Sequence, residues 1–123
     1  MAKILIIEDD ATLQKVLTQY LIEEKFEVRS ALDGEIGVKT AFSEKPDLIL
    51  LDIILPKKDG YKVMEEIKAN EQTKKIPILI LTNLENIIDV EKALELGATT
   101  YMVKADYKLE DVAAKIKEIL GMK

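Results

Sequence analysis

The sequence predicts an α/β fold, a three-layer sandwich in which a five-stranded parallel sheet lies between two layers of helices. Short apolar runs rich in β-branched residues, such as ILII at 4–7 and LILL at 48–51, suit strands that are buried on both faces. Most of these runs are followed by apolar residues at helical spacing. Strands that alternate with helices of this length form right-handed βαβ units, which build parallel sheets. We expect one domain over residues 1–123.

The five predicted strands differ in how far they are buried. Three are nearly continuous apolar runs, whereas the second alternates Phe26, Val28 and Ser30 with polar residues, as a half-covered edge strand does. The central strand ends near Asp52, because a proline and an Asp-Gly turn soon follow. The predicted strands span residues 3–7, 26–31, 48–52, 76–81 and 99–103.

Five further segments carry apolar residues three or four positions apart, which is typical of helices with one buried face. The first of these helices covers residues 11–24, and Pro46 stops the second. Gly97 and Gly121 stand where a helix commonly ends in a left-handed residue, after the fourth and fifth helices. The apolar faces of the second to fifth helices are centred on Val38, Val63, Val90 and Val112.

The composition excludes several classes of function. A formal charge of −5 and a pI near 4.9 argue against nucleic acid as a direct partner. No apolar run approaches the length of a membrane helix, and the N-terminus lacks a signal-peptide pattern. The absence of cysteine rules out disulfides and thiolate metal sites and suits the cytoplasm. The absence of histidine rules out an imidazole base, a histidine-ligated zinc and an internal phosphohistidine.

Polar residues stand at the carboxyl ends of four predicted strands. They are the triplet Glu8-Asp9-Asp10 after the first strand, Asp52 at the end of the third, Thr82 after the fourth and Lys104 after the fifth. In a parallel sheet these ends lie on one rim, where open α/β sheets bind ligands. Carboxylates brought together there repel one another unless a cation intervenes. Because every ligand offered is oxygen, the cation we predict is Mg²⁺.

These residue types indicate phosphoryl transfer. Mg²⁺ would gather the oxygens of a phosphoryl group and neutralise the charge that develops during transfer. Asp52 would be the nucleophile and hold the phosphoryl group as an acyl phosphate. Lys104 would pair with one phosphoryl oxygen, and the Thr82 hydroxyl would donate to another. The acidic triplet could also simply cap the following helix; we assign that role to Asp10 and metal binding to Asp9.

This set of residues resembles the motifs of receiver domains of two-component response regulators, particularly the single-domain chemotaxis type. The resemblance covers essentially the whole chain. Its motifs are the acidic pair Glu8 and Asp9, the pattern D-x-x-x-P-x-x-x-G starting at Asp52, the hydroxyl of Thr82 and the amine of Lys104. Each motif is weak by itself, but four in order at the family's intervals are specific. The resemblance implies a flavodoxin-like receiver fold with strand order 2-1-3-4-5.

The resemblance also implies a ligand set and a switch. Asp9 and Asp52 would bind Mg²⁺ directly, Glu8 would act largely through water, and the backbone carbonyl of Ile54 would complete the protein ligands. Tyr101 matches the family's switch aromatic, which turns inward when the strand-four hydroxyl moves toward the phosphoryl group. That movement would remodel the surface of the fourth helix, fifth strand and fifth helix, where a downstream protein docks.

Since the chain has no histidine, its phosphoryl donor must be external. We expect a phosphohistidine on a sensor histidine kinase or a histidine phosphotransfer protein, or a small phosphodonor. The result would be a switch that changes protein binding rather than a turnover enzyme.

Two other functions stay open. A Mg²⁺-dependent phosphohydrolase of the haloacid-dehalogenase type would also use an aspartate nucleophile, usually as D-x-D after the first strand, but Ile54 stands two residues after Asp52. A pseudo-receiver would serve as a scaffold and never take phosphate. The complete acidic set argues against a scaffold, while Ala105, where the family usually has proline after the lysine, leaves room for one.

Overall fold

The structure is a computed structural model, which describes residues 1–123 except 54, 56, 83–86, 104–107 and 123, and describes only the main chain at 82 and 87–89. Its elements in chain order are β1 (Lys3–Ile7), α1 (Ala11–Glu23), β2 (Glu27–Ala31), α2 (Gly34–Glu44), β3 (Leu48–Leu51), α3 (Gly60–Ala69), β4 (Ile78–Thr82), α4 (Ile87–Glu95), β5 (Thr100–Val103) and α5 (Leu109–Ile119). This order is the predicted one. β4 begins two residues later than predicted, because Ile76 still belongs to the preceding turn, where its N–H donates to the Thr73 carbonyl at 3.0 Å.

The strands form one parallel sheet in the order β2-β1-β3-β4-β5, which confirms the predicted fold class and strand order. Ile7, the last residue of β1, lies opposite Ala31 of β2 and Leu51 of β3. In the other half of the strand order, Thr82 at the end of β4 lies opposite Val103 at the end of β5. The carboxyl ends of the strands therefore meet along one edge of the sheet.

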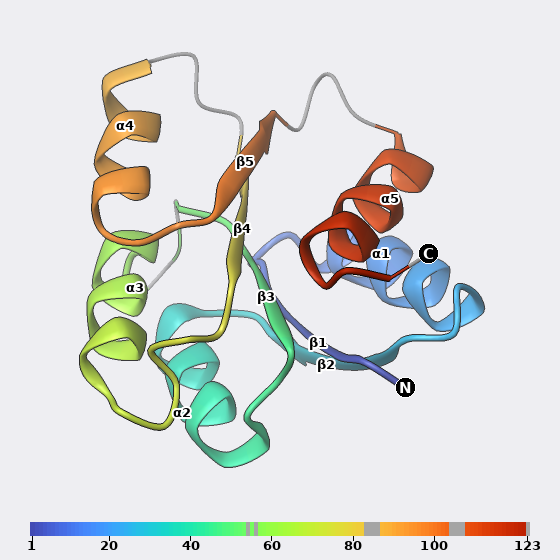
Figure 1. Cartoon of the computed structure of the whole chain (residues 1–123), viewed down its shortest axis with the longest axis horizontal. Coiled ribbons are helices and arrows are strands. Elements are labelled where there is room, and N and C mark those ends of the chain that lie inside the picture. The colour runs from blue at the N-terminus through green and yellow to red at the C-terminus, as the bar shows by residue number, and fades with distance from the viewer. Residues whose placement is uncertain (54, 56, 83–86, 104–107, 123) are drawn as a thin grey trace.

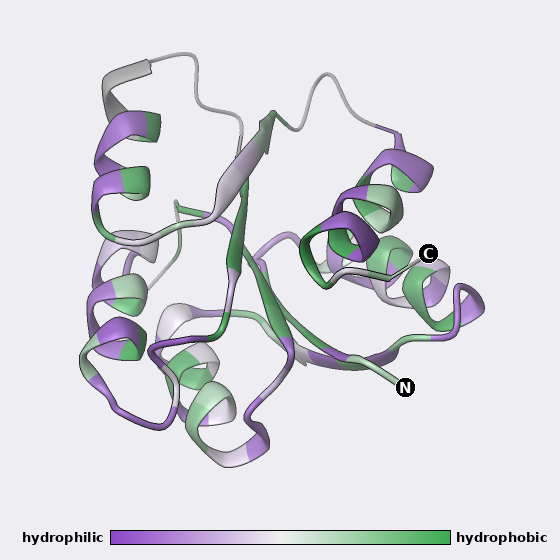
Figure 2. Ribbon diagram, viewed as in Figure 1, coloured by the Kyte–Doolittle hydropathy of each residue, from purple (hydrophilic) through white to green (hydrophobic). Residues whose placement is uncertain are grey.

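Helices cover both faces of this sheet. Figure 1 shows α1 and α5 on one face and α2, α3 and α4 on the other. Successive residues of a strand point to opposite faces, so Ile6 and Leu50 pack with the α1–α5 layer while Leu5 and Ile49 pack with the α2–α3 layer. Figure 2 shows the apolar sides of the helices turned toward the strands. Burial of these two apolar clusters is the main force that stabilises the fold.

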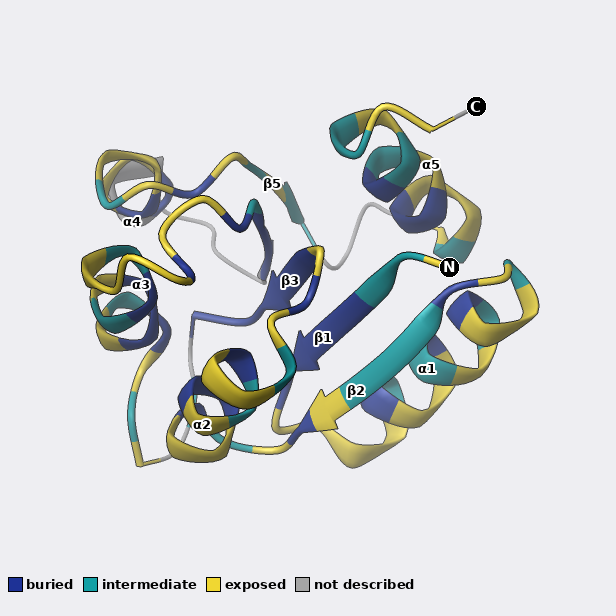
Figure 3. Cartoon of the chain, turned by 60° about the horizontal axis from the view of Figure 1, so that its bottom comes forward, coloured by how far each residue is buried: buried dark blue, intermediate teal, exposed yellow. Residues whose placement is uncertain are grey.

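The edge strand is less covered than the centre of the sheet. β1 and β3 are almost entirely buried, whereas β2 is mostly half-buried (Figure 3). This confirms the predicted edge strand, in which Val28 is half-buried and Ser30 is exposed. Ser30 is exposed because it lines an open hollow between α1 and the end of β2, together with Ala11 and Thr18.

Three aspartates fix where helices begin. The side chain of Asp10 accepts hydrogen bonds from the N–H groups of Thr12 and Leu13, which confirms it as the N-cap of α1. Asp33 and Asp59 cap α2 and α3 in the same way. These side chains satisfy N–H groups that have no partner within the helix. In the part of the chain that the structure describes, no helix combines the length and the apolar character that a membrane crossing needs.

Away from the carboxyl ends of the strands, a network of ion pairs ties α2 to β1 and β2. Lys3 Nζ lies 3.2 Å from Glu44 Oε1, and Arg29 Nε lies 3.0 Å from the same oxygen. Arg29 also pairs with Glu27 at 3.0 Å. The hydrogen bond and the charge of Lys3, helped by Arg29, hold the pKa of Glu44 below its usual value. The network therefore joins three elements that are distant in the sequence.

We expect Glu44→Gln to make the fold less sensitive to acid. Because the pKa of Glu44 is lowered by folding, its stabilising contribution is present above the usual pKa of 4.5 and is lost as pH falls through the folded value. Urea unfolding between about pH 6 and about pH 3 should therefore show a smaller loss of stability in Glu44→Gln than in the wild type.

The matched control is Glu35→Gln, since Glu35 is half exposed and pairs with Lys39 on the helix surface at 3.6 Å. This control should keep the wild-type dependence on pH. An unchanged acid dependence in Glu44→Gln would contradict the expectation.

Candidate metal centre

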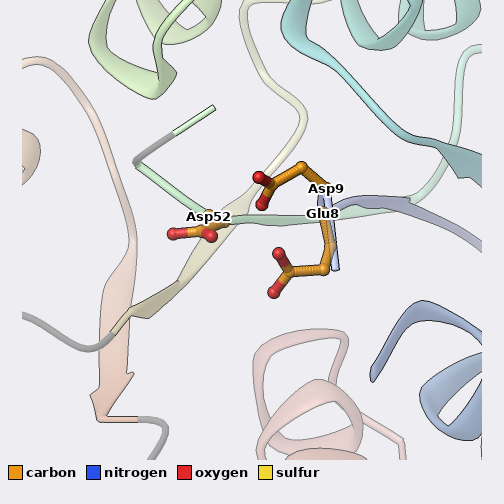
Figure 4. Close-up of side chains that lie close together, drawn as sticks. All are labelled: Glu8, Asp9 and Asp52. Carbon is orange, nitrogen blue, oxygen red and sulfur yellow. The ribbon is translucent and has the colours of Figure 1, made fainter. Parts of the chain in front are cut away.

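Three carboxylates meet where the two central strands end. Glu8 and Asp9 follow β1 directly, and Asp52 follows β3 directly. The sheet brings them together because β1 and β3 are neighbours and the Asp52 N–H donates to the Ile7 carbonyl at 3.0 Å. One carboxylate oxygen from each residue lies within 4.8 Å of the other two. Figure 4 shows the three side chains gathered beside the end of β3.

The three acids differ in their exposure to solvent. Glu8 is 2% exposed and Asp52 is 7% exposed, whereas Asp9 is exposed. Glu8 is also held by hydrogen bonds: its Oε2 accepts from the Asp10 N–H at 3.2 Å, and its own N–H donates to the Ala31 carbonyl at 3.0 Å. The centre therefore has a buried, fixed side and an open side at Asp9.

This donor set fits Mg²⁺. All three ligand groups are carboxylate oxygens, which a hard cation prefers. In an octahedral Mg²⁺ complex, opposite ligands lie about 4.2 Å apart, so oxygens already within 4.8 Å need only small movements or one bridging water. Like charges held this close in a partly buried place repel one another, and a divalent cation would offset that repulsion.

The other predicted site residues lie at the same edge or beyond what the structure describes. Thr82, predicted to follow the fourth strand directly, is the last residue of β4. Lys104 and Ile54 lie outside the described residues, so their roles stay predictions. Tyr101 lies on β5 with 40% of its surface exposed, and its role as the switch aromatic stays a prediction.

The main chain of Asp52 and Ile53 is packed tightly against the start of α3. A Cβ atom added to Gly60 would lie 2.5 Å from Ile53 Cα and 2.8 Å from the Asp52 carbonyl oxygen. Both neighbours are backbone atoms, which cannot move aside without shifting the main chain. Glycine at this position therefore allows α3 to begin directly against the residue that carries the central carboxylate.

One residue of this region, Gln14, was not predicted from the sequence. Gln14 is 6% exposed, and its side-chain amide donates to the carbonyl groups at the ends of β1 and β2. The signal was present, because Gln14 stands three and seven residues before Leu17 and Leu21 and so shares their buried face. A polar residue at a core-facing position of an amphipathic helix needs a partner inside the protein.

Comparison with known proteins links this fold and site to one family. The family model described as the response regulator receiver domain matches residues 4–117. The chain is 40% identical over 118 residues to the alkaline phosphatase synthesis transcriptional regulatory protein PhoP of Bacillus subtilis, an alignment that covers 96% of this chain and 48% of PhoP. The chain spans about half the length of the curated relatives it matches.

Two solved structures are similar over 98% of this chain and 98% of their own. One is a putative response regulator from Chloroflexus aurantiacus J-10-fl, with a TM-score of 0.90 and 31% identity. The other is the receiver domain of a sensor histidine kinase from Pseudomonas aeruginosa PAO1, with a TM-score of 0.89 and 31% identity. The second structure has a magnesium ion coordinated in its active site cleft.

We expect Mg²⁺ to stabilise the protein through Asp9. A ligand that binds only the folded state adds about 2.7 kcal/mol at a hundred times its dissociation constant. In urea titrations the wild type should gain stability as Mg²⁺ is added, and Asp9→Asn should lose most of that gain because a charged ligand is removed.

Asp10→Asn is the control. Asparagine caps a helix as well as aspartate, and this substitution removes one negative charge next to the site, just as Asp9→Asn does. It should keep most of the gain. Full stabilisation by Mg²⁺ in Asp9→Asn would show that the cation binds elsewhere.

Proposed function

Because this chain belongs to the family of response regulator receiver domains, we propose that it takes a phosphoryl group on Asp52 and thereby changes its protein-binding surface. Receiver domains of response regulators are signalling switches, which histidine kinases phosphorylate and which bind Mg²⁺ at an acidic site. The observation that carries the proposal is the convergence of Glu8, Asp9 and Asp52 at the end of the central strand.

In the proposed step, a carboxylate oxygen of Asp52 attacks the phosphorus atom of a donor phosphohistidine. The new O–P bond forms, the N–P bond to the imidazole breaks, and the released imidazole takes a proton from solvent. Mg²⁺ held by Glu8, Asp9 and Asp52 would supply positive charge to the phosphoryl oxygens. The exposure of Asp9 supports this arrangement, because it leaves one side of the centre open to the donor.

Two further side chains would complete the site. Thr82 ends the strand next to β3, and its hydroxyl is proposed to donate to a phosphoryl oxygen. Lys104 follows Val103, which pairs with Thr82, and its amine is proposed to bind another oxygen. The carbonyl of Ile54 is proposed as a third protein ligand to the metal. These assignments rest on the sequence motifs and on the positions of the described strand ends.

The output of the switch is proposed to pass through Tyr101. The residue is 40% exposed and lies on β5, the edge strand of the sheet, which runs between α4 and α5 (Figure 1). A ring that lies outward here can turn inward when Thr82 moves toward a bound phosphoryl group. The phosphoryl group would then favour one of two states and change the surface of α4, β5 and α5, where a downstream protein docks.

The proposed donor is a sensor histidine kinase, a histidine phosphotransfer protein or a small phosphodonor. We propose a switch rather than a turnover enzyme, because the D-x-D pattern of the phosphohydrolases is absent at Asp52. PhoP is named a transcriptional regulator, and control of transcription is a proposal for any longer protein that contains this domain. From the net charge and the composition, we propose that the domain itself does not bind nucleic acid and acts in the cytoplasm.

We expect the wild type to gain one phosphoryl group when it is incubated with acetyl phosphate and Mg²⁺, as measured by intact mass. Without the metal it should gain none within the same time, because the carboxylates then repel the anionic donor. Asp52→Asn should gain none under either condition, since the nucleophile is gone.

Asp59→Asn is the matched control, because Asp59 is an exposed aspartate seven residues away whose capping role asparagine can fill. It should be labelled like the wild type. Labelling of Asp52→Asn to the wild-type extent would reject Asp52 as the acceptor.

A further inference from the structure

We propose that Gln14 is a positioning residue for the metal centre, because its amide holds the main chain that carries Glu8. The proposal rests on the Mg²⁺ site described above. Gln14 lies in α1 and is 6% exposed. Its Nε2 atom lies 3.1 Å from the Ile6 carbonyl oxygen, 3.0 Å from that of Ala31 and 3.4 Å from that of Glu8. One side chain thus contacts the ends of both β1 and β2 beside the acidic residues.

The orientation of this amide follows from its neighbours. All three groups around the nitrogen are carbonyl acceptors, so the NH₂ end must face them. The two hydrogens of the NH₂ group serve three acceptors. The contact with the Glu8 carbonyl is the longest of the three and therefore the weakest. The Oε1 atom of Gln14 is buried and has no hydrogen-bond partner among the described residues. A buried oxygen without a hydrogen-bond partner costs free energy, which an apolar side chain would avoid. We therefore attribute the role of the amide to the carbonyl groups that its NH₂ group binds.

The Ala31 carbonyl links Gln14 to Glu8. It accepts a hydrogen bond from Gln14 Nε2 at 3.0 Å and another from the Glu8 N–H, also at 3.0 Å. Glu8 is thus held at its N–H by Ala31, at its carbonyl by Gln14 and at its carboxylate by the Asp10 N–H. Partners of this kind orient the groups at a metal site, and their loss commonly weakens metal binding about 10- to 100-fold.

A purely structural role for Gln14 makes a different prediction. β1 and β2 are already joined by five pairs of residues along the sheet, so a tie between the same strands would contribute stability and nothing specific to the metal. Loss of the amide would then make unfolding easier and leave the Mg²⁺ affinity unchanged. The affinity for Mg²⁺ therefore separates the two roles.

The test compares two neutral variants of Gln14 with a buried control. Gln14→Met has a similar length but no donor, and Gln14→Asn keeps the amide on a chain one methylene shorter. Thr73→Val is the control, because the Thr73 hydroxyl is also fully buried and donates to the Ile67 carbonyl at 2.7 Å after α3. Calorimetric titration with MgCl₂ gives the dissociation constant, and urea unfolding without Mg²⁺ gives the stability.

We expect Gln14→Met to weaken Mg²⁺ binding about tenfold, and Gln14→Asn to weaken it in the same direction. Thr73→Val should bind like the wild type even though it unfolds more easily. Binding by Gln14→Met within about twofold of the wild type, or equal weakening in Thr73→Val, would overturn the proposal. If Gln14→Met fails to fold, Gln14→Asn decides by the same criterion. A wild type that takes up no Mg²⁺ would instead reject the proposed function itself.

Discussion

Three carboxylates held together at the end of a buried sheet set the constraint on which the remaining structure depends. Glu8 and Asp52 are almost fully buried, and Asp9 lies beside them. Their mutual repulsion opposes folding, so the surrounding fold must hold them. The apolar clusters on both faces of the sheet supply that stability, and the hydrogen bonds from neighbouring strand ends fix the positions. A cation that enters the centre relieves the repulsion and thereby couples ligand binding to the state of the protein.

The packing around the central loop serves the same constraint. Gly60 lets α3 begin against the backbone of Asp52 and Ile53. Gly34, at the start of α2, has no room for a Cβ atom because the carbonyl group of Lys58 lies against it. Ile53 and Lys58 are thus packed against the first turns of α3 and α2. This gives a physical reason for the final glycine of the D-x-x-x-P-x-x-x-G pattern, because any side chain there would collide with main-chain atoms.

Charges at the two ends of the sheet have different arrangements. Near the amino ends of β1 and β2, Glu27 and Glu44 are paired with Lys3 and Arg29. At the carboxyl ends, acids from two strands face one another within reach of a single ion. Ion pairs at the first end join elements of the scaffold, whereas the acidic group at the other end suits a cation.

The sequence by itself determined the order of the elements and the identity of the rim acids. Apolar spacing reports burial locally, and parallel strands place their carboxyl ends on one edge, so Glu8, Asp9 and Asp52 could be named together. Only the tertiary structure decided that Glu8 is buried while its neighbour Asp9 is exposed. Adjacent residues point in opposite directions, and which direction is covered depends on the packing of other segments. The same holds for Gln14, whose carbonyl partners at Ile6 and Ala31 come from separate strands that no local pattern specifies.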